Sequence, residues 1–196
     1  MFEGKVVLVT GGNRNTGLWI VKKFVDEGAR VFMCGSSEAS TAKGVEALKA
    51  MGVAATLLPA ASGCLAPLGC SAEAARGTVG GVLAQACDVG DRAQVNALMD
   101  LIEREAGTLD ILVNNAADQG LGLGGPLEMD PDAILKVMGT NVRGGFQVTQ
   151  AAANRFFMKR PRPQVEIGGG GREALGDRGV VVFLSSNTAQ RADSPR

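Results

Sequence analysis

The stretch 5–17, KVVLVTGGNRNTG, constrains the fold of this chain more than any other. An apolar run breaks into a glycine-rich turn, and a helical pattern follows at once, with apolar residues at Leu18, Val21 and Val25. A buried strand that turns tightly into a helix leaves free backbone N–H groups at the positive end of the helix dipole, which favours a phosphate there. Gly11 permits the sharp turn, and Gly17 permits close approach of the backbone to a ligand or a neighbouring strand. The pattern predicts a dinucleotide-binding turn; a purely structural strand–helix turn is the alternative.

Further apolar runs alternate with helical patterns along the chain. We expect strands at 29–34, 53–58, 82–87, 109–113 and 179–184, and further helices at 39–51, 92–106 and 131–158. Because the strands are apolar almost throughout, helices must cover both faces of the sheet that they form. The order predicts an α/β fold, a Rossmann-like doubly wound parallel sheet, with ligands beyond the carboxyl ends of its strands.

The composition excludes several classes of function. The 196 residues include 20 Lys and Arg and 20 Asp and Glu, and this balance without a basic cluster argues against nucleic-acid binding. We find no signal peptide and no run long enough to span a membrane, so we expect a soluble cytoplasmic protein without a membrane partner. The chain has no His and no Cys-x-x-Cys pair, so we expect no metal site, and Cys34 and Cys87 are expected to be buried thiols.

Polar motifs recur where the expected strands end. They are Thr10-Gly11-x-x-x-Asn15-Thr16-Gly17, Asp88-Val89, Asn114-Asn115-Ala116-Ala117 and Ser185-Ser186, with Asn141 inside the long helix. Together and in this order they resemble the short-chain dehydrogenase/reductase family. The resemblance covers nearly all of the single dinucleotide-binding domain expected at 1–196, apart from irregular blocks at about 59–81 and 161–178. It implies an NAD(P)-dependent oxidoreductase that transfers hydride between a cofactor and a carbonyl or alcohol group.

The resemblance assigns a cofactor role to several matching residues. The turn that holds Gly11, Asn15 and Gly17 would bind the pyrophosphate, and Asn15 replaces the usual middle glycine as the next best residue for an unusual backbone conformation. Asp88 would hydrogen-bond the adenine, and Val89 would help to enclose it.

Three further side chains match the remainder of the family's site. Asn115 would lie against the ribose on the nicotinamide side; a buried amide that joins adjacent strands is the alternative, and the two are compatible. Asn141, an unusual residue inside a helix, matches an Asn that bends the helix and holds a water of the proton relay; a solvated polar position is the alternative. Ser186 matches a serine that hydrogen-bonds the substrate oxygen as a donor rather than a nucleophile, and a plain turn hydroxyl is the alternative.

The end of the second strand favours NADP(H) over NAD(H). An acidic residue there would bind the ribose 2′-OH of NAD and repel a 2′-phosphate. This chain has Cys34-Gly35-Ser36-Ser37 instead, so that Ser36 and Ser37 offer hydroxyl donors. Arg14 stands in the phosphate turn, where related NADP-dependent enzymes carry a basic residue; a solvent-facing Arg14 is the alternative.

One departure from the family pattern concerns its chemistry. The family uses a Tyr-x-x-x-Lys pair on the helix after the Ser186 strand, and this chain contains no Tyr. Without it, proton transfer to the substrate oxygen has no agent, so we expect no activity from this chain alone. We also expect a sheet that is incomplete at its C-terminal edge, where 179–184 exposes apolar residues. These features and the two irregular blocks indicate an incomplete or mis-assembled version of a normal reductase.

Two other functions remain open at this point. The chain could be a non-catalytic dinucleotide-binding or regulatory protein, or an enzyme to which another subunit supplies Tyr and Lys. The expected partner is a small carbonyl or alcohol substrate of open identity. Relatives often pair through the helix that matches 131–158, so a homo-oligomer is a family-based expectation.

Overall fold

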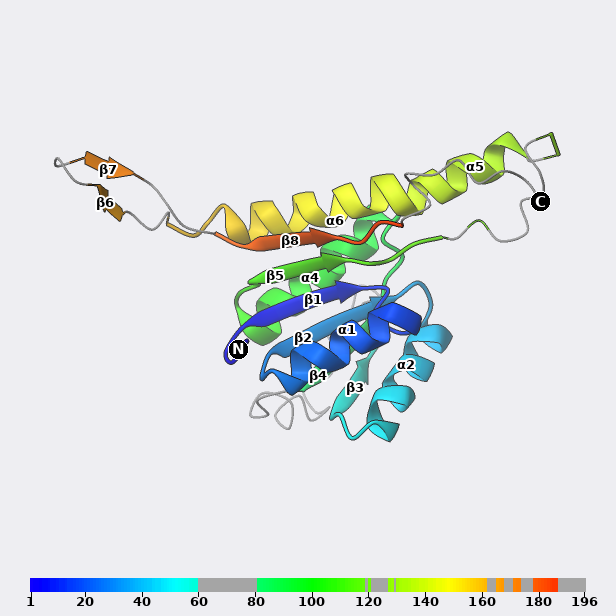
Figure 1. The fold of residues 1–196 in the computed structure, drawn as a ribbon. Helices are drawn as coiled ribbons and strands as arrows, with labels where there is room; N and C mark the ends of the chain where they lie inside the picture. The colour runs from blue at the N-terminus through cyan, green and yellow to red at the C-terminus, as the bar shows by residue number, and fades with distance from the viewer. Residues whose placement is uncertain are drawn as a thin grey trace.

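Six parallel strands form one sheet in the order β3-β4-β2-β1-β5-β8 (Figure 1). The computed structural model describes residues 1–59, 81–118, 120, 127–128, 130–161, 165–167, 171–173 and 178–186. The strands are β1 Val6–Thr10, β2 Arg30–Gly35, β3 Ala55–Leu58, β4 Val82–Ala86, β5 Ile111–Asn114 and β8 Val180–Phe183. Every neighbouring pair is parallel, which confirms the predicted Rossmann-like sheet.

The helices begin and end close to where the sequence predicts them. They are α1 Asn15–Asp26, α2 Glu38–Ala50 and α4 Arg92–Ala106, followed by one helical run of α5 Pro131–Met138, η1 Gly139–Gly144, α6 Gly145–Ala152 and η2 Ala153–Phe157. The Asp91 carboxylate caps α4 by accepting hydrogen bonds from the N–H groups of Ala93 and Gln94. The expected helix at 131–158 is confirmed, but η1 and η2 are π-helical, a conformation frequent at functional sites.

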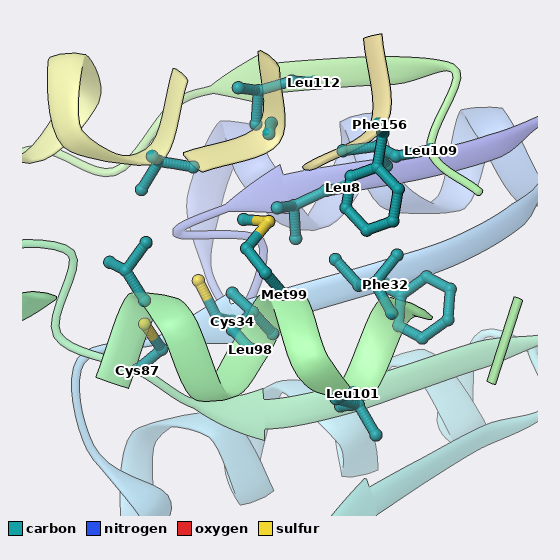
Figure 2. Close-up of a cluster of buried hydrophobic side chains, with 14 of the residues drawn as sticks. Leu8, Phe32, Cys34, Cys87, Leu98, Met99, Leu101, Leu109, Leu112 and Phe156 are labelled. Atoms are coloured by element: carbon teal, nitrogen blue, oxygen red, sulfur yellow. The ribbon is translucent and has the colours of Figure 1, made fainter. Parts of the chain in front are cut away.

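Two hydrophobic cores lie on opposite faces of the sheet because side chains alternate along each strand. Along β1, Val7 and Val9 pack with α1 and α2, whereas Leu8 packs with α4, α6 and η2. Figure 2 shows the second core, where Leu8 and Phe32 of the sheet lie near Leu98 and Met99 of α4. The sheet is therefore covered on both faces, as the apolar strands predict.

The predicted buried thiols are confirmed. Cys34, the last residue but one of β2, has no exposed surface, and Cys87 follows β4 with 2 % of its surface exposed. Figure 2 places both side chains in the same core. The pKa of the Cys87 thiol is raised by its hydrogen bond with the Cys34 thiol and by its burial. The Cys87 thiol therefore stays protonated at neutral pH.

The prediction that 161–178 is irregular throughout is wrong. Val165–Ile167 forms β6 and Gly171–Glu173 forms β7, and the two pair antiparallel as a separate two-stranded sheet. The apolar–polar–apolar order of Val165, Glu166 and Ile167 suits a strand, but three residues are too few for alternation to be recognised in the sequence. The other block, 59–81, lies outside the described residues except at its two ends.

β8 stands at one end of the strand order and exposes apolar side chains, as predicted for 179–184. Val182 is 41 % exposed and Phe183 is 58 % exposed.

The long helical run also exposes apolar side chains, one at every fourth residue: Ile134, Met138, Val142 and Phe146. Among the helices in the described ranges, none combines the length and apolar character needed to cross a membrane.

Candidate cofactor site

The residues singled out in the sequence gather at one edge of the sheet. Parallel strands present their carboxyl ends on the same side, and the described segments after β1, β2, β4, β5 and β8 carry Gly11, Ser36, Asp88, Asn115 and Ser186. The prediction that the polar motifs lie at strand carboxyl ends is confirmed. This is the edge at which open α/β sheets bind their ligands.

The turn between β1 and α1 forms a cradle that side chains would fill. A Cβ atom on Gly17 would overlap the Gly11 carbonyl oxygen and approach the Asn115 Nδ2 atom to 2.5 Å. Gly11 has a φ of +62°, and a Cβ there would lie 2.8 Å from the Ala116 Cα. Asn15 has a φ of 47°, so it adopts the left-handed conformation expected at this position. The two glycines therefore let the turn and the start of α1 pack directly against the end of β5, as glycines do in dinucleotide-binding turns.

Asn115 and Thr10 fasten this turn to the end of β5. The Asn115 side-chain amide donates to the carbonyl oxygens of Thr10 at 3.0 Å and Gly11 at 2.9 Å. In return, the Thr10 hydroxyl accepts hydrogen bonds from the backbone N–H groups of Asn115 and Ala116, both at 3.1 Å. The expectation that Asn115 joins adjacent strands is confirmed, but the residue is partly exposed and not buried as expected. Its contact with a cofactor ribose stays a prediction.

The β1–α1 turn also contacts the end of β2. The Gly12 N–H donates to the Cys34 carbonyl at 3.1 Å, and the Asn13 side chain donates to the Ser40 carbonyl at 3.2 Å. These contacts bring the turn beside the β2–α2 connection, where Ser36 is exposed. Arg14, the N-cap residue of α1, is exposed as well. Exposed guanidinium and hydroxyl donors thus lie on two segments that touch each other.

The loop after β4 presents a carboxylate next to a buried valine. Asp88 is exposed, and its Oδ1 atom accepts a hydrogen bond from the Gly90 N–H at 2.9 Å. The Asp88 N–H donates to the Gln94 side chain at 2.9 Å. Val89 is 5 % exposed and packs against Gly144 of η1. The loop thus has an exposed acceptor next to an apolar side chain that packs into the protein.

Asn141 lies on the π-helical segment η1 and joins it to the segment that follows β5. Its Oδ1 atom accepts from the Asp118 N–H at 2.7 Å, and its Nδ2 atom donates to the Asp118 carbonyl at 2.9 Å. The side chain is exposed, as the alternative expected, yet both ends of its amide are engaged. Ser186, three residues beyond β8, is exposed at the same edge of the sheet.

Comparisons with known proteins agree with this geometry. The family model described as short chain dehydrogenase matches residues 5–62, and the model described as enoyl-(acyl carrier protein) reductase matches residues 69–168. A 3alpha-hydroxysteroid dehydrogenase from Mediterraneibacter gnavus is 31 % identical over 154 residues, which are 78 % of this chain and 50 % of the relative. This chain belongs to the short-chain dehydrogenase/reductase family.

Other members of the family extend the comparison. A D-threitol dehydrogenase from Mycolicibacterium smegmatis is 31 % identical over 95 % of this chain and 58 % of its own length. A solved short-chain dehydrogenase/reductase from Serratia marcescens is 26 % identical with a TM-score of 0.66, and the match covers 98 % of this chain and 60 % of that one. The chain thus spans about half the length of the curated relatives that it matches.

Two residues that hold the loops at this edge of the sheet were missed as individual candidates. Thr10 was read only as the start of the turn motif, although its hydroxyl accepts two backbone N–H groups of the β5 segment. Gln147 of α6 is 3 % exposed and donates to the Val89 carbonyl at 2.9 Å. In the sequence, Gln147 stands out only as a polar residue between the apolar Phe146 and Val148. A helical pattern does not show which loop its side-chain amide contacts.

Proposed function

We propose that this chain forms the cofactor-binding part of an NAD(P)-dependent oxidoreductase that acts on a small carbonyl or alcohol substrate in the cytoplasm, with NADP(H) preferred. The observation that carries the proposal is the close packing of the Gly17 backbone against the Gly11 carbonyl oxygen and the Asn115 side chain at the start of α1. Such close packing is one of the roles of glycine in a dinucleotide-binding turn, in which the helix N-terminus receives the pyrophosphate. The cofactor, when bound, supplies hydride chemistry, and the exposed row along α5–α6 suits pairing of two copies.

Each site residue then has a role that its position supports. Gly11 and Gly17 let the pyrophosphate-binding turn pack closely against the end of β5, and Asn115 holds the turn in place beside the nicotinamide ribose. The exposed Asp88 carboxylate accepts the adenine amino group beside Val89. At the reactive end, Asn141 holds the proton-relay water and the Ser186 hydroxyl donates to the substrate oxygen.

Removing the positive charge of Arg14 is expected to reduce the preference for NADP(H). Arg14→Ala should weaken NADPH binding about tenfold and leave NADH binding nearly unchanged, because only the 2′-phosphate gains from the guanidinium. Calorimetric titration of both cofactors at low salt measures this difference. Lys43→Ala, which removes an exposed cation from α2, is the matched control and should change neither affinity. Equal weakening of NADPH and NADH binding by Arg14→Ala would contradict the assignment.

The isolated chain is expected to bind NADPH without consuming it. Its sequence contains no tyrosine, the family's acid/base, so the substrate oxygen lacks its proton donor. The measurement is the loss of NADPH absorbance with a panel of ketones and aldehydes, beside calorimetric binding of NADPH to the same preparation. Carbonyl reduction above the protein-free rate would overturn this expectation.

The second candidate function is a non-catalytic dinucleotide-binding or regulatory protein. The observation in its favour is the combination of a closely packed glycine turn at a helix N-terminus with a sequence that has no tyrosine. NADPH binding without turnover by the native protein, purified from its source, would favour this second function, whereas carbonyl reduction by that protein would favour the oxidoreductase.

A further inference from the structure

We propose that Gln147 is a positioning residue for the adenine end of the cofactor site. Its buried amide holds the carbonyl of Val89 and so fixes the loop 88–90 against α6. This inference rests on the proposed function, which places the adenine at Asp88 and Val89. A residue of α6, a helix that makes none of the proposed contacts with the base, would then contribute to base recognition.

The burial of Gln147 is unusual for its chemistry. Only 3 % of its surface is exposed, and Val148 beside it is fully buried in the core between the sheet and α6. A buried amide costs free energy unless it is hydrogen-bonded. Its Nε2 atom donates to the Val89 carbonyl at 2.9 Å, across 58 positions of the sequence. The amide therefore connects the helix to the loop after β4.

Gly144 completes the contact on the same face of the helical run. It precedes Gln147 by three residues, so the two positions are neighbours on the helix surface. A Cβ on Gly144 would lie 2.7 Å from the Val89 Cγ2 atom and 3.3 Å from its carbonyl carbon. The missing side chain at Gly144 admits Val89, and the amide of Gln147 binds its carbonyl oxygen. Val89 is thus held at its side chain and at its backbone.

Fixing Val89 also fixes the orientation of the neighbouring carboxylate. Asp88 binds the Gly90 N–H through Oδ1 and the Gln94 side chain through its own N–H, both at 2.9 Å. The loop is then held from α4 by Gln94 and from α6 by Gln147. Loss of the contact with α6 leaves the Val89 carbonyl to find another partner, and the loop shifts. The carboxylate then no longer meets the amino group of adenine.

The test compares NADPH with its analogue that carries hypoxanthine in place of adenine, using the full chain. Hypoxanthine offers a carbonyl where adenine offers an amino group, so the wild-type protein should prefer NADPH. Gln147→Met keeps the length of the side chain and removes the donor. We expect about tenfold weaker binding of NADPH and unchanged binding of the analogue. Gln150→Met is the matched control, since Gln150 is exposed on α6 and bonds Arg92; it should bind both as the wild type does.

A second variant displaces Val89 without touching the amide. Gly144→Ala introduces a Cβ that would collide with Val89. Alanine favours the helical conformation, so we expect this variant to fold. It therefore tests the role of the Val89 contact even if Gln147→Met does not fold. It should reduce the base preference in the same way. Wild-type protein that binds no NADPH would defeat the proposed function itself. Variants that keep the wild-type base preference, or that lose both ligands equally, would overturn only the role of Gln147.

Discussion

Replacing Gly17 by alanine is expected to eliminate detectable NADPH binding and to destabilise the fold. The new Cβ would overlap the Gly11 carbonyl oxygen and lie 2.5 Å from the Asn115 Nδ2 atom. Neither neighbour can move freely, because the Asn115 amide is bonded to the Thr10 and Gly11 carbonyls. The turn must therefore open away from β5, which changes the cradle for the pyrophosphate. We expect the free energy of unfolding to fall by about 1–3 kcal/mol, as for other overpacked sites.

The measurements are chemical denaturation and calorimetric titration with NADPH. Gly139→Ala is the matched control, because a Cβ on Gly139 meets nothing within 4 Å and its backbone is already helical. That variant should bind NADPH as the wild type does and be at least as stable. Wild-type affinity and stability in Gly17→Ala would show that the turn tolerates a side chain, and would remove the main support for the cofactor site.

Replacing Asn115 by leucine is expected to loosen the attachment of the β1–α1 turn to the end of β5. Leucine has a similar shape but donates no hydrogen bond, so the carbonyl oxygens of Thr10 and Gly11 lose the amide that binds them. We expect the free energy of unfolding to fall by about 1–3 kcal/mol, the usual cost of leaving buried polar groups without their partner. NADPH binding should weaken as well, since the turn is no longer held at the end of β5. Urea denaturation and NADPH titration measure the two effects.

The control is Asn96→Leu, which removes an exposed amide from α4. It should leave both the stability and the affinity near the wild-type values. If Asn115→Leu loses stability but binds NADPH normally, Asn115 joins the strands without contributing to the cofactor site. Unchanged stability would contradict the importance of the two hydrogen bonds themselves.

Much of the fold was predictable because local signals agree along this chain. Five apolar runs and their intervening helical patterns were placed within two residues of β2, β3, β4, β5 and β8. Both helix starts carry local signals: the Asp91 side chain caps α4, and the Asp130 side chain caps α5 with Pro131 at its first position. β6 and β7 were missed because three-residue strands carry too little pattern, and the π-helical conformation of η1 has no sequence signature that distinguishes it from an α-helix.

For the site, the sequence by itself determined which residues stand at the carboxyl ends of the strands. Parallel strands place those ends on one edge of a sheet, so Gly11, Asp88 and Asn115 had to gather there once the strand pattern was read. Only the tertiary structure decided which groups touch. The two hydrogen bonds of Asn115 with the turn and the contact of Gln147 with Val89 join residues 58 or more positions apart. Such contacts depend on how helices pack on the sheet and how the turn folds back, which no local pattern of residues specifies.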